Sequence, residues 1–197
     1  MLELDTPRGT ARAHLHQAAE PRAALVLGHG AGGGVAAPDL VAATSAALDT
    51  GVSVALVEQP YRVAGRRSPA PAAQLDVAWI SVVEQLRGGE LGGLPLLTGG
   101  RSSGARVACR TAAATGAAGV LCLAFPLRPP GRATAPSRLD ELDAVTVPML
   151  VVQGERDPFG IPPPSHLRSV VVVPGNHSLR SAEPVTDAVR DWLSRLA

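Results

Sequence analysis

Short apolar runs alternate along the chain with longer stretches in which apolar residues recur at helical spacing. The apolar runs predict buried strands, and the periodic stretches predict helices with one face toward the protein core. The clearest helix is expected over residues 72–86, where Leu75, Trp79 and Val82 fall on one face. Further helices are expected at 38–48, 103–114 and 184–196, with one helical turn at 138–143.

Glycine and proline separate the expected strands. Residues 11–16 alternate apolar and polar side chains and predict an edge strand. The last strand, 169–173, is rich in valine, which is typical of a strand buried on both faces. The remaining strands are expected at 23–27, 52–57, 94–98, 119–125 and 149–153. Because strands and helices alternate, we predict an α/β fold with a mainly parallel sheet, helices on both faces and ligands at the carboxyl ends of the strands.

Length and composition narrow the possible functions. The 197 residues fit one domain, 1–197, and 46% hydrophobic residues supply enough apolar material for a core. A net charge of +1 does not favour nucleic acid or an anionic membrane as a partner. All 18 basic residues are arginine, which excludes Schiff-base chemistry, a pyridoxal phosphate anchor, a P-loop lysine and a kinase lysine.

Several features favour a cytoplasmic protein. The first residues include Glu3 and Asp5 and lack the apolar segment of a signal peptide. No apolar run approaches the ~18 residues needed to cross a bilayer. Cys109 and Cys122 are expected to be buried thiols. The arginine-only basic set, with many Ala, Gly and Pro residues, is typical of a GC-rich bacterial genome.

One glycine-rich turn carries a chemical motif. Gly100-x-Ser102-x-Gly104 lies between an expected strand and an expected helix and matches a nucleophile elbow. In such an elbow the serine oxygen projects above the sheet, and the amide of the next residue, here Ser103, faces a developing oxyanion. The five-residue pattern alone also fits a turn in which Ser102 only caps the helix.

A nucleophilic serine needs a base, and the base needs an acid to orient it. Asp157 follows the strand expected at 149–153, and His177 follows the strand expected at 169–173. The chain order Ser102, Asp157, His177 is the order of an α/β-hydrolase triad. We expect these three residues to be catalytic, with no metal or cofactor.

The glycine loop at 28–34 follows an early strand, where a second oxyanion donor is expected. We assign that donor to the amide of Ala31, with Gly30 as the alternative. The same loop also spells Gly28-x-Gly30-x-x-Gly33, a dinucleotide fingerprint, with Glu58 at the end of the next strand. A helix that begins only near residue 38 lies too far along the chain to hold a pyrophosphate, so the dinucleotide reading is the minor alternative.

Two further clusters invite a functional interpretation. His14 and His16 share one face of a strand, but two solvated side chains are a simpler interpretation of this pair than a metal site. Arg62, Arg66 and Arg67 form a basic cluster after the strand expected at 52–57. A solvated loop is the usual explanation for such a cluster, and the alternative is a loop near the carboxyl ends of the strands that favours anionic groups there. The Pro- and Arg-rich stretch 128–137 is expected to be a surface loop.

Four longer blocks carry a family resemblance. They span 28–34, 58–67, 125–132 and 153–160. The elbow and the triad order look like the α/β-hydrolase superfamily, and the blocks are similar to the testis-expressed-protein-thirty-like and NSL-complex-subunit-three-like hydrolases. Dienelactone hydrolases are more distant relatives, and they carry a cysteine where this chain has Ser102. The resemblance implies Ser102 as nucleophile, His177 as general base, Asp157 as orienting acid and the Ser103 amide in the oxyanion hole.

The expected activity is therefore hydrolysis of an ester or thioester of a small molecule. The interval 127–148 is too short for a lid domain, so the site is expected to be open. Residues expected at the pocket wall, or alternatively in local loop packing, are Phe125, Leu127, Phe159 and Ile161. The alternative from another functional class is an interaction module that keeps the hydrolase fold, because fold alone does not determine function.

Overall fold

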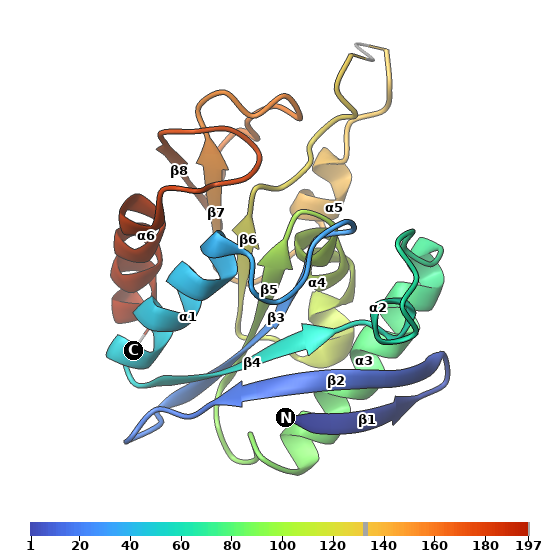
Figure 1. Ribbon diagram of the computed structural model, residues 1–197. Coiled ribbons are helices and arrows are strands. Elements are labelled where there is room, and N and C mark those ends of the chain that lie inside the picture. Colours follow the sequence, from blue (N-terminus) through green and yellow to red (C-terminus); the bar gives the residue numbers. More distant parts are fainter. Residues whose placement is uncertain (132–133, 197) are drawn as a thin grey trace.

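A computed structural model describes residues 1–131 and 134–196 and contains a sheet of eight strands (Figure 1). The strands are β1 Leu2–Thr6, β2 Gly9–His16, β3 Ala23–Gly28, β4 Val52–Glu58, β5 Leu96–Arg101, β6 Gly119–Leu123, β7 Met149–Gly154 and β8 Arg168–Val173. Their order across the sheet is β1-β2-β4-β3-β5-β6-β7-β8. Strands β3 to β8 pair parallel, whereas β2 pairs antiparallel with both β1 and β4. The predicted α/β fold with a mainly parallel sheet is confirmed.

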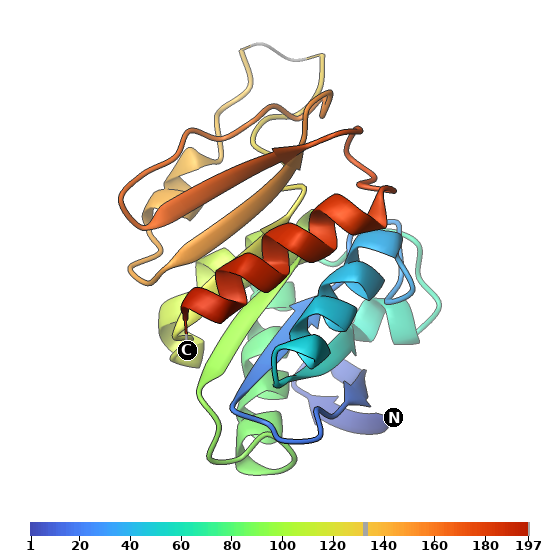
Figure 2. The ribbon, with the colours of Figure 1, turned by 90° about the vertical axis from the view of Figure 1, so that its left-hand side faces the viewer.

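Helices cover both faces of the sheet. They are α1 Pro38–Asp49, α2 Pro60–Val63, α3 Ala72–Gly88, α4 Ser103–Thr115, α5 Leu139–Asp143 and α6 Ala182–Arg195. Helices α1 and α6 pack side by side on one face (Figure 2), and α3, α4 and α5 lie on the other. Helix α2 was not predicted because a single turn is too short to show helical periodicity. The loop expected at 128–137 lies partly outside the described residues, which omit 132 and 133.

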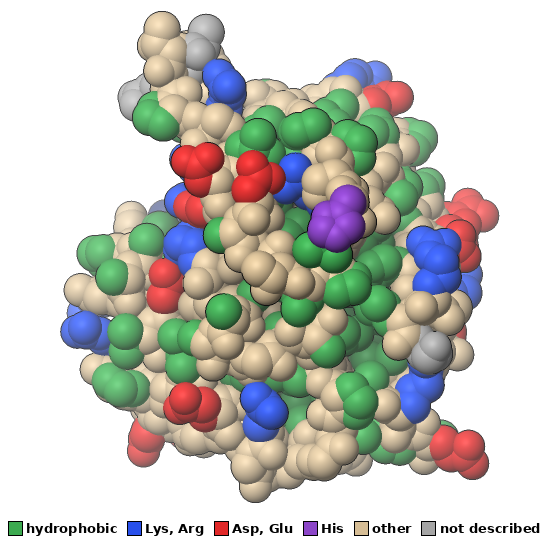
Figure 3. Space-filling view, turned by 180° about the vertical axis from the view of Figure 1, so that it is seen from behind, with side chains coloured by type: hydrophobic (Ala, Val, Ile, Leu, Met, Phe, Trp, Pro, Cys, Tyr) green, Lys and Arg blue, Asp and Glu red, His purple; other side chains and the backbone are tan. Residues whose placement is uncertain are grey.

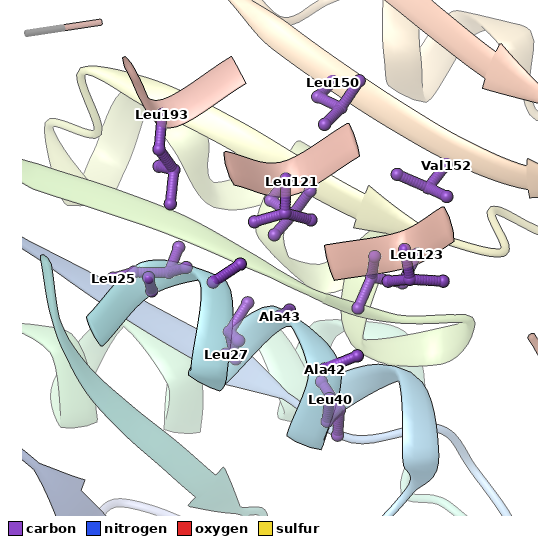
Figure 4. Close-up of a cluster of buried hydrophobic side chains, with 14 of the residues drawn as sticks. Leu25, Leu27, Leu40, Ala42, Ala43, Leu121, Leu123, Leu150, Val152 and Leu193 are labelled. Atoms are coloured by element: carbon purple, nitrogen blue, oxygen red, sulfur yellow. The ribbon is translucent and has the colours of Figure 1, made fainter. Parts of the chain in front are cut away.

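Each face of the sheet buries its own set of side chains, because successive residues of a strand point to opposite sides. In β3, Leu25 and Leu27 join the cluster under α1 and α6, whereas Val26 joins the cluster under α3. Figure 4 shows the first cluster, in which Leu40 of α1 and Leu193 of α6 reach toward the leucines of the sheet. Each such side chain contributes about 1.5–3 kcal/mol when fully buried.

Two predictions about the sheet edges are wrong. The strand at 11–16 is not an edge strand, because β1 pairs along its outer side from Leu2↔Ala13 to Thr6↔Gly9. The valine-rich strand β8 is not buried on both faces, since it is the outermost strand and Val172 is 50% exposed. In both cases the position of a strand in the sheet depends on long-range pairing, which the local pattern does not contain.

Other buried groups follow the expectation. Cys109 and Cys122 are free and buried, with their Sγ atoms 3.4 Å apart. Hydrogen bonding between the two thiols and burial raise the pKa of Cys122, so it is a protonated core residue.

Over the described part of the chain, every helix is too short or too polar to cross a bilayer.

Candidate active site

The sheet topology brings the predicted loops together. The chain runs from β3 to β4 on one side and then crosses back to β5 on the other side, so the direction of the connections reverses at β3. Such a reversal opens a crevice at the carboxyl ends of the strands, where ligands bind in open α/β sheets. The glycine loop after β3 and the elbow after β5 meet at this point.

Ser102 occupies a strained turn between β5 and α4. Its backbone has φ 52° and ψ −108°, a conformation that is costly for a residue other than glycine. The turn is possible because its neighbours are small: a Cβ on Gly100 would lie 2.5 Å from the carbonyl oxygen of Gly28, and one on Gly104 would collide with the same oxygen. The Gly100-x-Ser102-x-Gly104 pattern therefore forms an elbow, as predicted, and Ser102 makes no side-chain cap to α4.

Ser102, His177 and Asp157 form a continuous chain of hydrogen bonds. Nε2 of His177 lies 2.9 Å from Oγ of Ser102, and Nδ1 of His177 lies 2.8 Å from Oδ2 of Asp157. A carboxylate only accepts, so the proton of the neutral ring lies on Nδ1 and Nε2 accepts from the serine hydroxyl. Hydrogen bonds thus bring together three loops that are separated by up to 75 positions in the sequence.

The carboxyl group of Asp157 has no exposed side-chain surface, and three donors hold it. Besides His177, Nε2 of Gln153 donates to Oδ2 at 2.8 Å and the amide of Phe159 donates to Oδ1 at 2.9 Å. Gln153 also bonds both the amide and the carbonyl oxygen of Phe125, which fixes its own side chain. This role of Gln153 was not predicted, because a single glutamine at the end of an apolar strand shows no catalytic pattern in the sequence.

The two amides predicted as oxyanion donors, those of Ala31 and Ser103, follow β3 and β5. Within the described residues, neither the amide of Ala31 nor that of Ser103 donates to another backbone carbonyl. Ser103 is the first residue of α4, whose dipole favours negative charge at that end. His29 holds the glycine loop, since its Nδ1 lies 2.8 Å from the oxygen of Gly30 and its Nε2 accepts from the amide of Gln59 at 3.2 Å. Burial lowers the pKa of His29, which keeps this ring neutral.

The family model described as an alpha/beta hydrolase domain matches residues 21–188. The chain belongs to this α/β-hydrolase family. No curated protein matches the sequence.

Solved structures share the α/β-hydrolase fold over nearly the whole chain. XC6422 from Xanthomonas campestris, described as a serine hydrolase without a lid, is 19% identical, with a TM-score of 0.76 over 98% of this chain and 93% of that one. Est1E from Butyrivibrio proteoclasticus is 16% identical, with a TM-score of 0.78 over 99% and 98%. A dienelactone hydrolase from Anabaena variabilis is 14% identical, with a TM-score of 0.76 over 98% and 94%. At these identities the likeness concerns the fold.

Arg101, the residue before the elbow serine, links the loop of His177 to the first turn of α1 in this α/β-hydrolase. Its Nη2 donates to the carbonyl oxygen of His177 at 2.7 Å, and its Nε donates to Oδ2 of Asp39 at 3.3 Å. A Cβ on Gly30 would lie only 2.8 Å from Nη1 of Arg101, so this glycine makes room for the guanidinium. Burial raises the pKa of Asp39, and the charge of Arg101 opposes that shift. Sequence reasoning missed Arg101 because its partners are distant in the sequence.

The surroundings of the site correct one prediction about the pocket wall. Phe125 has no exposed surface and belongs to the core, so it does not line a pocket. Phe159 lies against the ring of His177, with the two ring centroids 4.3 Å apart, and Ile161 is 41% exposed. The loop at 174–181, between β8 and α6, carries His177 and is called the histidine loop. A hollow of about 300 Å³ lies between the glycine loop and the histidine loop, and it is lined by Gly32, Gly33, Ala37, Pro38, Arg101, Ser178 and Arg180.

Two minor interpretations can now be judged. Helix α1 begins at Pro38, so the glycines at 28–34 do not form its first turn and the dinucleotide fingerprint lacks its phosphate-binding helix. His14 has an acidic neighbour that spacing did not reveal, because Nε2 of His14 lies 3.1 Å from Oε2 of Glu58 on β4. Among the described residues this pair has no third ligand that would complete a metal site.

Proposed function

We propose that the chain is a serine hydrolase that cleaves carboxylic esters or thioesters of small molecules. The observation that carries the proposal is the chain of hydrogen bonds from Ser102 through His177 to Asp157, with distances of 2.9 and 2.8 Å. In this proposal Ser102 is the nucleophile, His177 is the general base, and Asp157 orients the imidazole. The amides of Ser103 and Ala31 stabilise the oxyanion.

The reaction runs in two halves. As Oγ of Ser102 attacks the substrate carbonyl carbon, its proton passes to Nε2 of His177, and the carbonyl oxygen becomes an oxyanion. The tetrahedral intermediate then collapses: the bond to the leaving oxygen or sulfur breaks, and that atom takes the proton from His177. Water next attacks the acyl group on Ser102, giving its proton to His177, which returns a proton to Oγ as the acid leaves.

The proposal includes finer assignments. A loop with one short helix, α5, connects β6 to β7, and among the described residues no lid domain is inserted there. An open site excludes water poorly, which favours small or activated esters. We place the chain, as one domain, in the testis-expressed-protein-thirty-like and NSL-complex-subunit-three-like branch on its four sequence blocks. The free, buried cysteines agree with the reducing cytoplasm of a bacterium.

A fluorophosphonate probe tests the nucleophile, since it reacts with activated serines. We expect labelling of Ser102, located by peptide mass spectrometry, and hydrolysis of p-nitrophenyl acetate. Ser102→Ala should abolish labelling and lower kcat by about 10⁶-fold, while Ser103→Ala keeps the backbone amide and should retain both. An unlabelled, folded wild-type protein that cleaves no ester would refute the proposal and favour an interaction module.

A further inference from the structure

A groove lies beside α2, at the same edge of the sheet as the elbow. It consists of two hollows of about 320 and 550 Å³, which share Tyr61, Arg66, Ala70 and Gln74 in their walls. We call it the Tyr61 groove. Two segments that are distant in the sequence form it: the β1–β2 turn, and the continuous stretch from Gln59 through α2 to the first turns of α3.

The Tyr61 groove carries positive charge without a counter-charge. Arg8 and Arg66 line the smaller hollow, and Arg66 and Arg67 line the larger one. Among the described residues no Asp or Glu lines either hollow, and no ion pair engages any of these three guanidinium groups. Burial raises the pKa of Tyr61, so its hydroxyl adds no negative charge at neutral pH.

Arginines behave differently on the face formed with α3, α4 and α5. Arg110 pairs with Asp76 at 2.6 Å and with Glu141 at 3.4 Å, and Arg106 pairs with Glu141. Figure 3 views the molecule from the side opposite to Figure 1. It shows acidic and basic side chains next to one another, below the loop between β6 and α5 that projects at the upper left. Cations that have partners stabilise the fold, whereas a concave site with three unpartnered cations is complementary to an anion.

Tyr61 connects the groove to the proposed oxyanion loop. Its hydroxyl donates to the carbonyl oxygen of Ala31 at 3.1 Å, and its ring lies 5.8 Å from that of His29. Pro60 and Leu75 add apolar surface to the lining of the smaller hollow, beside polar residues such as Gln59 and Gln74. Tyr61 therefore belongs to the lining of the groove and also contacts the loop that carries the proposed oxyanion donor.

We propose that the Tyr61 groove binds an anionic group of the substrate, a carboxylate or a phosphate joined to the ester by an apolar spacer. Arg8 and Arg66 provide guanidinium donors for that anion, a geometry suited to both carboxylate and phosphate oxygens. The inference rests on the proposed hydrolase function and adds a substrate class to it. The basic cluster noted in the sequence contributes Arg66 and Arg67 to the groove lining, while Arg8 joins them only through the fold.

Substrate pairs of equal chain length test the proposal. The anionic members are p-nitrophenyl half esters from succinate to suberate and the matching phosphonates, and the neutral members are the straight-chain p-nitrophenyl esters. For wild type, kcat/KM should favour the anionic member at the spacer length that spans Tyr61. Arg8→Gln and Arg66→Gln should each lower kcat/KM for the anionic member about two- to fivefold more than for its neutral partner. High salt should reduce that preference as well, because the arginines are exposed.

Arg195→Gln is the matched control, since this exposed arginine lies at the end of α6, away from the groove. Equal preference in wild type, Arg8→Gln and Arg66→Gln would overturn the proposal while the hydrolase function stands. Comparison of half esters with phosphonates identifies which anion is preferred. If Ser102 is not labelled and no ester is cleaved, calorimetry with suberate and phenylphosphonate decides: binding lost in Arg8→Gln/Arg66→Gln supports the groove, and no binding to wild type refutes it.

Discussion

The proposed active site and the Tyr61 groove both lie at the carboxyl ends of the strands, but they differ in whether their charged side chains have partners. At the site, the charged groups of Asp157 and Arg101 are held: three donors bond the carboxylate of Asp157, and Arg101 donates to Asp39 and to the carbonyl oxygen of His177. In the groove, Arg8 and Arg66 have no acidic partner among the described residues. Charged side chains that have partners hold the loops of the site in place, whereas charged side chains without partners in a hollow are free to bind a ligand.

The difference has consequences for mutation. A buried charge that loses its partner is left with an uncompensated desolvation cost, so changes at the site should affect both stability and rate. An exposed, unpartnered arginine leaves no such cost when it is replaced, so changes in the groove should affect ligand preference alone.

The largest expected effect tests the most completely bonded group. Asp157→Asn replaces one carboxylate oxygen by an NH₂ group, although three donors now point at this carboxylate. The NH₂ group would then face another hydrogen-bond donor, and the ring of His177 would lose its anionic partner. Ester hydrolysis should fall by about 10⁴-fold in kcat, with little change in KM. Asp187→Asn, at an exposed residue of α6, is the control. Equal rates for Asp157→Asn and wild type would show that Asp157 does not orient the base.

A smaller effect separates positioning from stability at Arg101. Arg101→Met leaves the fully buried carboxylate of Asp39 without its cation and should lower the unfolding free energy by about 3 kcal/mol. The rate should also fall by about tenfold, because the carbonyl of His177 loses its donor and the histidine loop loosens. Both quantities are measured, by urea unfolding and by ester kinetics.

The double variant Arg101→Met/Asp39→Asn sharpens this test. It removes both charges, so stability should largely return, while the rate stays low because no donor reaches the carbonyl of His177. Recovery of the rate together with stability would mean that Arg101 acts only through the fold.

The smallest effect is a pH dependence of stability at His29. Its pKa is lowered in the folded protein by burial, so as pH falls below the unfolded value of 6.5 the unfolded chain takes up the proton first. This residue therefore contributes stability that is present at higher pH and lost on acidification. The drop in Tm between pH 7.5 and 5.5 should be smaller for His29→Gln than for wild type. An identical drop in both proteins would contradict a neutral role for this ring.

Much of the fold and of the site was predictable from local patterns. The strand–helix order, the start of α1 at Pro38 and the elbow at Ser102 all follow from neighbouring residues, because periodicity, proline and small glycines act over a few positions. Asp157 and His177 were predictable because strand ends in a parallel sheet share one edge. The exposure of β8 was not predictable, since valines at an edge look like valines in the middle of a sheet.

The supporting residues depended on contacts that only the folded chain makes. Gln153 and Arg101 donate to backbone carbonyl oxygens of distant loops. Every residue type has such a carbonyl group, so the sequence does not indicate which residues are the partners. By itself the sequence determined the fold class and which residues stand at the ends of its strands, because these follow from short-range pattern. Only the tertiary structure decided which strands form the edges, how the site is held and that Arg8 lies with Arg66, because those facts depend on pairing between segments far apart in the chain.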